Sequence, residues 1–204
     1  MKNLIITISR QYGSGGRKIG QQLAEELGIP FYDSEIIDLA AKESGLAADF
    51  IRGQEQQLTQ SLLFSLVTNF TSNSSAFNPN MLSLSDQVYL AQAKAIRSLA
   101  DKGPCVIVGR CADYILADYK PFRIFVYADM ASKMARCRAK GPEHEHFSDK
   151  ELRQHIQKVD KNRAAYYEFY TGQGWGDKLH YDLCVNTTNA EIKTMVPILA
   201  KMFQ

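Results

Sequence analysis

The stretch ITISRQYGSGGRKIG, residues 6–20, indicates how the chain folds at its start. It continues the apolar run Leu4–Ile8, whose β-branched residues are typical of a short buried strand. After its glycines, apolar residues recur every four positions as far as Leu27, so they lie on one face of a helix that Gly28 can end. The order of strand, glycine-rich loop and helix is typical of a loop that binds phosphate.

The glycine-rich loop resembles the pattern G-x-x-x-x-G-K-[ST], but Gly16 stands where the pattern has lysine. Backbone N–H groups of such a loop, with the positive end of the following helix, suit phosphate oxygens. Arg17 or Lys18 can supply the cation that position 16 lacks. The alternative is an ordinary turn, but the position of the loop between strand and helix favours a phosphate site. The expected phosphate-binding residues are Gly13, Ser14, Gly15, Gly16, Arg17, Lys18 and Ile19.

The composition is that of a single globular domain spanning 1–204. Of the 204 residues, 45% are hydrophobic, which is enough for a full core. The 24 basic and 22 acidic residues leave a net charge of only +2, which argues against general binding to nucleic acid or membrane surfaces. Any cationic site must therefore be local.

The sequence has no features of export or of a disulfide framework. The N-terminus enters a strand-like run at once, and no apolar segment reaches the length of a membrane span. The four cysteines lie far apart without a C-x-x-C pair, so we expect reduced thiols and a cytoplasmic protein. His144 and His146 could bind metal as an H-x-H pair, but in a charged segment such a pair is more often exposed, and we expect no metal ligands there.

Three further runs of strand length follow, at 105–108, 122–127 and 181–185. Most are nearly continuous in apolar character, as strands buried on both faces of a parallel sheet are. A helical pattern over 87–100 ends just before the first of these runs. The alternation of strands and helices predicts an α/β fold with a parallel sheet.

Two segments interrupt this alternation. The first, at about 46–86, contains a helical pattern over 50–66 and a polar, turn-rich run over 71–80. Its apolar residues between 58 and 70 suit either the core or a dimer face, so the chain is expected to be a monomer or a homodimer. The second segment, at about 130–163, is strongly charged.

Two polar motifs follow predicted strands and are candidate ligand contacts. Asp33 ends a short strand-like segment, and Arg110 and Asp113 follow the buried run 105–108. Open α/β sheets bind ligands at the carboxyl ends of their strands, where arginine can hold a phosphate with two hydrogen bonds. The alternatives are that Asp33 caps the next helix and that Arg110 forms a surface ion pair.

The charged segment at 130–163 suits a lid over bound phosphates. Arg136 lies on one expected helix, and Asp160 and Arg163 lie three residues apart on another, where they share a face. Phosphoryl transfer needs cations around the transferred group and the exclusion of water. A solvated charged surface is the alternative. The nearby aromatic run Tyr166–Tyr170 can stack on a base or pack in the core.

Four stretches in order resemble the cytidylate kinase-like family, relatives of bacterial cytidylate kinase: ITISRQYGSGGRKIG, IPFYD, VIVGRCADYIL and VDKNRAAYYEFYTGQGWGDKLHYDLCVNT. The resemblance implies a three-layer P-loop NTPase fold, with a helical insertion for the nucleoside monophosphate at about 46–86 and a lid at about 130–163. It implies ATP as donor, Mg²⁺ bridging the phosphates, and CMP or dCMP as acceptor.

The resemblance also implies roles for individual residues. The loop Gly13–Lys18 would hold the donor phosphates. The acceptor site would be lined by Asp33, Arg110 and Asp113. The catalytic cations and lid residues would be Arg17, Lys18, Arg136, Asp160 and Arg163.

Two positions differ from cytidylate kinases and keep other functions open. Gly16 replaces the loop lysine, and Val108 stands where those kinases have an aspartate before the Gly-Arg pair. Besides a nucleoside monophosphate kinase, the chain can therefore be a nucleotide-binding protein with little turnover. The polar run at 72–80, which looks unlike a well-defined base pocket, also leaves open a P-loop kinase for another small metabolite.

Overall fold

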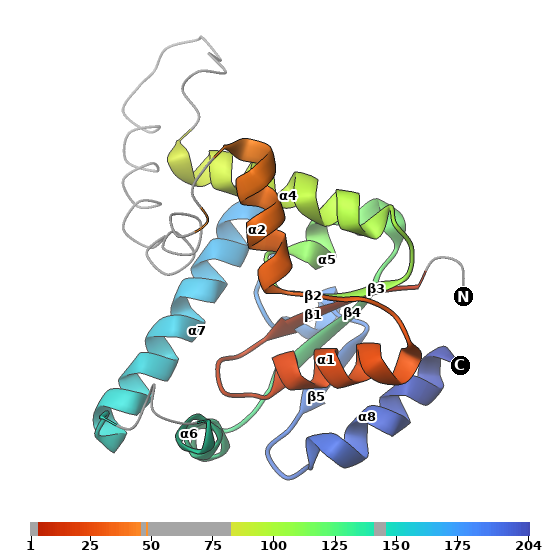
Figure 1. Cartoon of the computed structure of the whole chain (residues 1–204). Helices are drawn as coiled ribbons and strands as arrows, with labels where there is room; N and C mark the ends of the chain where they lie inside the picture. The colour runs from red at the N-terminus through yellow and green to blue at the C-terminus, as the bar shows by residue number, and fades with distance from the viewer. Residues whose placement is uncertain (1–3, 46–47, 49–82, 141–145) are drawn as a thin grey trace.

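The computed structural model describes residues 4–45, 48, 83–140 and 146–204, which fold around one sheet (Figure 1). All neighbouring strands are parallel, in the order β2-β3-β1-β4-β5. The strands are β1 (Ile5–Arg10), β2 (Phe31–Tyr32), β3 (Cys105–Val108), β4 (Phe122–Tyr127) and β5 (Leu183–Asn186). The predicted α/β fold with a parallel sheet is confirmed.

Helices cover both faces of the sheet and make three layers (Figure 1). The helices α1 and α8 lie on one face, and α2, α4, α5 and the end of α7 lie on the other. The α-helices are α1 (Gly16–Leu27), α2 (Ser34–Ser44), α4 (Leu84–Ala100), α5 (Ala112–Ile115), α6 (Met130–Ala139), α7 (Asp149–Thr171) and α8 (Ile192–Ala200). Short 3-10 helices lie at Ala117–Tyr119, Lys178–His180 and Lys201–Phe203.

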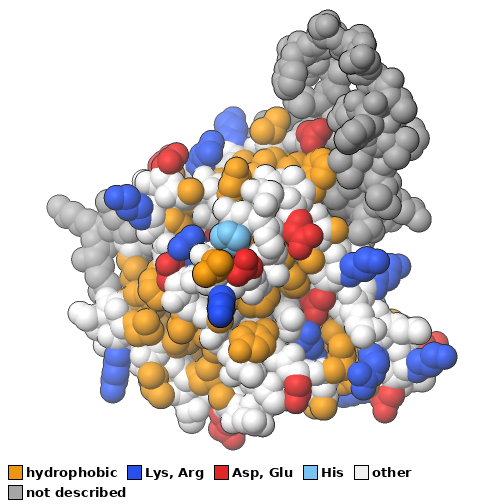
Figure 2. All heavy atoms as spheres, turned by 180° about the vertical axis from the view of Figure 1, so that it is seen from behind, with side chains coloured by type: hydrophobic (Ala, Val, Ile, Leu, Met, Phe, Trp, Pro, Cys, Tyr) orange, Lys and Arg blue, Asp and Glu red, His pale blue; other side chains and the backbone are white. Residues whose placement is uncertain are grey.

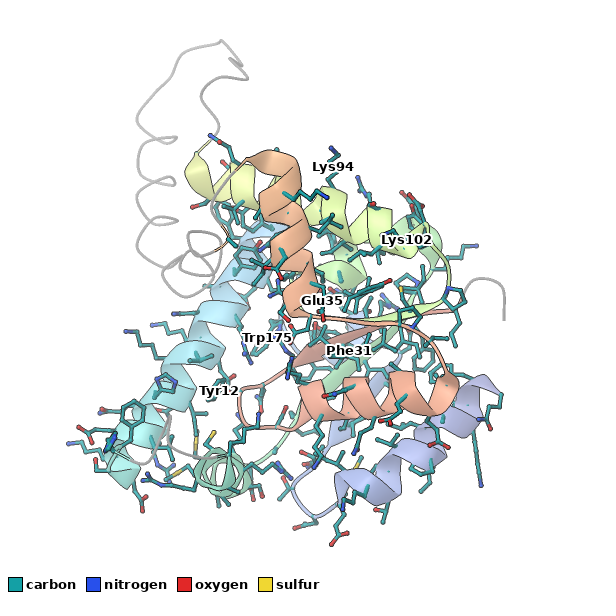
Figure 3. All side chains as sticks on the ribbon, in the orientation of Figure 1. Tyr12, Phe31, Glu35, Lys94, Lys102 and Trp175 are labelled. Carbon is teal, nitrogen blue, oxygen red and sulfur yellow. The ribbon has the colours of Figure 1, made fainter. Side chains whose placement is uncertain are left out.

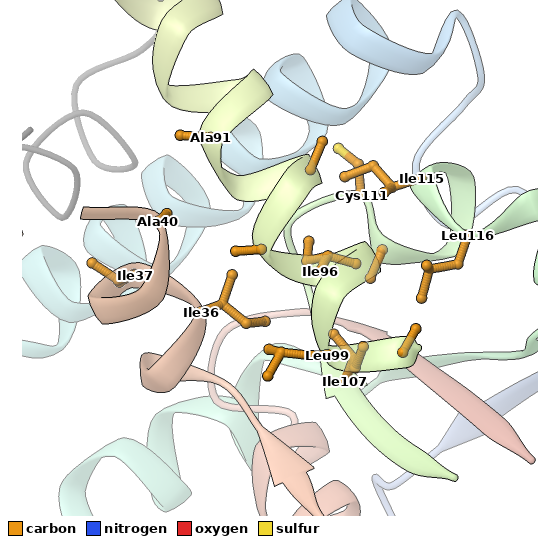
Figure 4. Packing of buried hydrophobic residues seen from close by; sticks show 14 of the residues in the cluster. Ile36, Ile37, Ala40, Ala91, Ile96, Leu99, Ile107, Cys111, Ile115 and Leu116 are labelled. Atoms are coloured by element: carbon orange, nitrogen blue, oxygen red, sulfur yellow. The ribbon is translucent and has the colours of Figure 1, made fainter. Parts of the chain in front are cut away.

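Each strand contributes to two separate cores because successive side chains point to opposite faces of a sheet. Ile6 and Ile8 pack beneath α1, whereas Ile5 belongs to the cluster on the other face. In that second cluster Ile36 of α2 and Ile96 of α4 lie close together above the sheet (Figure 4). Burial on both faces explains why the strands are continuous apolar runs in the sequence.

Two elements near the C-terminus differ from the sequence expectation. The last strand covers residues 183–186 rather than 181–185, because Tyr181 still ends the preceding 3-10 helix, where its N–H donates to the Lys178 carbonyl. The helix α8 was not expected, since Pro197 interrupts its short apolar run and proline disfavours helix interiors.

The insertion expected at about 46–86 lies mostly outside the described residues. This holds for the helix at 50–66, the loop at 71–80 and the apolar residues between 58 and 70. The described end of this insertion, residues 83–86, contains the start of α4. There the Ser83 side chain accepts a hydrogen bond from the Asp86 N–H. That cap places the start of α4 three residues before the expected start of a helix at 87–100.

The charged segment at 130–163 forms α6 and the first part of α7. A reciprocal cap of Ser148 and Glu151 starts α7, which continues through the aromatic run to Thr171. In that run Tyr170 stacks on Tyr89 of α4, with 4.1 Å between ring centroids. The aromatic residues therefore pack α7 against the body of the protein. Of the two histidines, His144 lies outside the described residues and His146 is exposed.

All four cysteines are free, and Cys105, Cys111 and Cys137 are buried. Burial raises the pKa of Cys105 to about 11 and that of Cys111 well above its ordinary value. These thiols behave as small apolar side chains. Within the described ranges, no helix combines the length and apolar character needed to cross a membrane.

Candidate active site

The glycine-rich loop between β1 and α1 has the backbone geometry of an anion site. Gly13 and Gly15 have φ of 72° and 83°, which only glycine adopts readily. The buried Ser14 is fixed at both ends, because its hydroxyl donates to the Gln11 carbonyl at 2.8 Å and its carbonyl accepts from the Thr187 hydroxyl at 2.7 Å. The first hydrogen bond of α1 runs from Ile19 N–H to the Gly15 carbonyl, so the N–H groups before Ile19 are not used by the helix itself.

Gly13 is also the point at which α6 touches the loop. A Cβ atom there would lie 2.8 Å from the Lys133 carbonyl oxygen and 3.1 Å from the Cys137 sulfur. The backbone of α6 therefore passes the loop at a distance that only glycine permits.

We expect Gly13→Ala to lower the free energy of unfolding by about 2 kcal/mol, because it adds a steric contact to the cost of about 1–2 kcal/mol for a left-handed residue. Urea unfolding measures this loss. Gly28→Ala is the matched control, since Gly28 has φ of 65° but no atom within 4 Å of its Cβ position. Equal losses in the two variants would contradict the close approach of α6.

A second group of charges lies where β2 and β3 end. The Asp33 carboxylate contacts Arg17 Nε at 2.6 Å and Arg110 Nη1 at 3.1 Å, and Arg110 Nη1 also donates to the Asp33 carbonyl at 2.8 Å. The Asp33 side chain makes no capping hydrogen bond to α2, and its carboxylate pairs with the two arginines instead. Arg17 lies over the Phe31 ring, and Figure 3 shows Phe31 and Glu35 where β2 leads into α2.

The two arginines differ in how firmly they are held. The Arg110 side chain is 9% exposed and the Arg17 side chain 56%. Arg110 also has φ of 55°, an uncommon conformation for a residue with a side chain. Strained backbone of this kind often occurs at functional sites. Arg110 is therefore the fixed cation of this group.

Opposing effects set the pKa of Asp33. Burial raises it, but the charges of Arg110 and Arg10 and the hydrogen bonds from Arg17 and Arg110 lower it by more, so the pKa lies below its ordinary value. The ionised carboxylate is therefore the form that the folded protein favours.

This depressed pKa predicts a pH dependence of stability. The stabilisation by Asp33 is fully present above the unfolded carboxyl pKa of about 4 and is lost as the pH falls through the lower folded value. We therefore expect the difference in unfolding free energy between the wild type and Asp33→Asn to be larger at pH 7 than near pH 3. Asp118→Asn, at an exposed position, is the control. A difference that is the same at both pH values would show that the ionised form of Asp33 does not stabilise the folded protein.

Arg10 joins the same group, although no site role was predicted for it. If Gly15 is the second glycine of G-x-x-x-x-G-K-[ST], the first glycine falls at position 10, so the spacing of the pattern could have identified Arg10. A Cβ atom at Gly109 would lie 2.5 Å from Arg10 Nη1, so the guanidinium reaches across to the end of β3. Its charge also lowers the pKa of Asp33.

The helices α6 and α7 touch the loop from the other side. The Asp160 carboxylate accepts from the Tyr12 N–H at 2.6 Å and pairs with Lys133 Nζ at 2.9 Å. Arg163 donates to the Arg10 carbonyl at 3.1 Å and lies over the Tyr12 ring, which Figure 3 shows between the loop and α7. The structure thus places Asp160 and Arg163 against the loop.

Lys133 was missed and Arg136 was predicted, although both lie on the same face of α6. Arg136 donates to the carbonyls of Gly13 and Thr187. The Lys133 side chain is only 6% exposed. Their spacing of three residues already indicates in the sequence that both lie on one face of the helix.

The remaining predicted residues lie elsewhere. Asp113 is 5% exposed and accepts from the Tyr167 hydroxyl at 2.8 Å, and burial raises its pKa more than that hydrogen bond lowers it. It lines a cavity of about 640 Å³ with Phe122 and Arg123, at the amino-terminal end of β4. Asp33 and Arg110, by contrast, follow the carboxyl ends of β2 and β3. Lys18 is exposed on α1.

The described arrangement concentrates positive charge between the loop and the end of β3. Three guanidinium groups, from Arg10, Arg17 and Arg110, lie around the Asp33 carboxylate. On the face of the molecule shown in Figure 2, basic and acidic side chains are interspersed. Several guanidinium groups beside the glycine-rich loop suit two phosphate groups close together.

Comparisons with known proteins show the family and the fold of the chain. A sequence model of the cytidylate kinase-like family matches residues 5–189. No curated protein matches the chain. Among solved structures, an uncharacterized protein from Eubacterium ventriosum has a TM-score of 0.67 and 26% identity, over 98% of this chain and 97% of that one.

Two shikimate kinases share the fold at lower identity. The enzyme from Bacteroides thetaiotaomicron has a TM-score of 0.57 and 14% identity, over 98% of both chains. The enzyme from Acinetobacter baumannii, solved in complex with shikimate, has a TM-score of 0.55 and 13% identity, over 99% of this chain and 94% of that one. These likenesses confirm the fold of a P-loop kinase and carry no information on the substrate.

Proposed function

The chain belongs to the cytidylate kinase-like family, and on that premise we propose that it transfers a phosphoryl group from ATP to a nucleoside monophosphate, with CMP or dCMP as the acceptor. One observation carries the proposal: Asp33 is held between Arg17 and Arg110 directly beside the glycine-rich loop. A donor phosphate on the loop and an acceptor phosphate on the arginines would meet between β1 and β3.

In this proposal the loop N–H groups bind the donor phosphates, and Arg110 binds the acceptor phosphate with two parallel hydrogen bonds. Arg136 and Arg163 would turn from loop carbonyls to phosphate oxygens when ATP enters, since both already lie against the loop. Catalysis then consists of placing two phosphates in line and neutralising the charge of the transferred group. No covalent nucleophile is required.

Mg²⁺ would arrive with ATP and neutralise charge on its phosphates. Kinase Mg²⁺ sites rely on substrate phosphates and water with few protein carboxylates. Among the described residues no three His, Cys, Asp or Glu side chains meet in a group that could hold a metal. The loop provides no carboxylate of its own, so we assign the metal to the bound nucleotide.

Two other functions keep support from particular observations. Gly16 lacks the loop lysine and Val108 lacks a carboxylate, which favours a protein that binds nucleotide with little turnover. A P-loop kinase for another small metabolite stays the second alternative, because the fold is shared with proteins described as shikimate kinases and does not by itself fix the acceptor.

The experiment is ADP release from Mg-ATP with CMP, dCMP, UMP, AMP, GMP, shikimate or no acceptor. Turnover with CMP or dCMP well above the others supports the proposal. Turnover with shikimate alone would move the acceptor to another class. ATP binding by calorimetry without turnover for any acceptor would favour the binding protein.

A further inference from the structure

We propose that Arg10 supplies the cation that the loop lacks at position 16 and binds the terminal phosphate of ATP. Relative to G-x-x-x-x-G-K-[ST], a glycine and a cation have exchanged places between positions 10 and 16. The inference rests on the proposed function and deepens it.

The exchange has a steric reason. A Cβ atom at Gly16 would lie 2.5 Å from the Cβ atom of Arg10 and 3.2 Å from its Cγ. A contact of 2.5 Å between carbon atoms is far below van der Waals distance, so only one of the two positions can carry a side chain. In this chain position 10 carries the arginine side chain, and the glycine at position 16 leaves room for it.

The direction of the Arg10 side chain suits the role. Its Nη1 atom lies 2.5 Å from the Cβ position of Gly109, so the guanidinium passes where only a glycine leaves room. This point lies between the loop and Arg110, which is also where the donor and acceptor phosphates would meet. The Arg10 carbonyl accepts from Arg163, which fixes its backbone.

The charge balance supports binding of an anion there. Arg10 acts on Asp33 through its charge, together with Arg110. Three guanidinium groups, from Arg10, Arg17 and Arg110, lie around the Asp33 carboxylate, so an anion that enters there meets a positive local field. A guanidinium also binds phosphate oxygens with two parallel hydrogen bonds, whereas lysine acts as a point charge.

The test restores the ordinary pattern step by step. Gly16→Lys alone, and Gly16→Lys with Arg10→Ala, keep a Cβ atom at both positions and are expected to fold poorly. Gly16→Lys with Arg10→Gly removes the 2.5 Å contact and leaves a Cβ contact of 3.1 Å with Val126, which a small shift relieves. This variant is expected to recover a cooperative urea transition. If it unfolds like the Ala variant, the steric exchange is wrong.

The charge role is tested by calorimetry with ATP and with adenosine. Arg10→Gln is expected to weaken ATP binding about 10-fold or more and to leave adenosine binding unchanged, because a charge-assisted hydrogen bond is lost. The restored variant with Lys at 16 and Gly at 10 is expected to bind ATP within a few-fold of the wild type. Arg153→Ala, at an exposed position on α7, is the control for loss of an arginine.

The two ideas fail in different ways. A wild type that does not bind ATP would refute the proposed function, and the role of Arg10 would fall with it. A wild type that binds ATP while Arg10→Gln binds it equally well would overturn the inference alone. The urea unfolding comparison uses no nucleotide, so its result does not depend on either ATP-binding outcome.

Discussion

Replacing Arg110 by alanine is expected to lower kcat/KM for the accepted monophosphate by about 10²–10³, the usual cost of one electrostatic stabiliser. The Arg110 side chain is nearly buried and is held by Asp33 through both its carboxylate and its carbonyl. A group fixed in this way needs no reorganisation when the phosphate arrives. Steady-state ADP release at saturating ATP measures the effect.

Arg17→Ala is the matched comparison, because Arg17 contacts the same carboxylate from an exposed position. We expect a smaller loss, of about 10-fold or less, since exposed ion pairs are screened by solvent. The ATP affinity of Arg110→Ala is expected to stay near that of the wild type. Equal losses in the two variants, or a loss confined to ATP affinity, would place Arg110 outside the acceptor site.

Lys133→Met is expected to destabilise the protein by about 3 kcal/mol. The substitution leaves the Asp160 carboxylate, 15% exposed, without the cation that lies 2.9 Å from it, and breaking a buried ion pair costs about 3–5 kcal/mol. The lower end applies because the Tyr12 N–H still donates to Asp160. Urea unfolding at neutral pH measures the loss.

Two variants show whether the unpaired charge is the cause. Lys133→Met with Asp160→Asn removes both charges, keeps an acceptor for the Tyr12 N–H, and is expected to recover most of the lost stability. Arg138→Met removes the cation of the exposed pair with Asp149 and is expected to cost less than about 1 kcal/mol. A double variant as unstable as Lys133→Met would mean that lost packing, and not charge, explains the effect.

Local patterns in the sequence were sufficient for the fold. The run at residues 4–8, the loop glycines and the spacing up to Leu27 depend on neighbours in the chain, and the structure places β1 and α1 there. The strands at 105–108 and 122–127 were also found at their observed positions, because burial on both faces leaves a continuous apolar run. The helix α8 was missed where Pro197 weakens the local signal.

Motif positions alone indicated a site at the carboxyl ends of the strands, with Asp33 and Arg110 in it, since that edge of a parallel sheet follows from connectivity. Which cations reach that edge depends on contacts between residues far apart in the chain. Asp113 follows the same strand as Arg110, yet the turn of α5 takes it to Tyr167.

Only the folded chain brings Lys133 to Asp160 and Arg10 to Gly109, across separations that no local pattern records. A hydrogen bond or a steric contact acts over a few ångströms, and the tertiary structure decides which side chains come that close. Thus the amino acids alone specify a glycine-rich loop on a parallel sheet, while packing of α6, α7 and β3 around that loop decides which charges lie beside it.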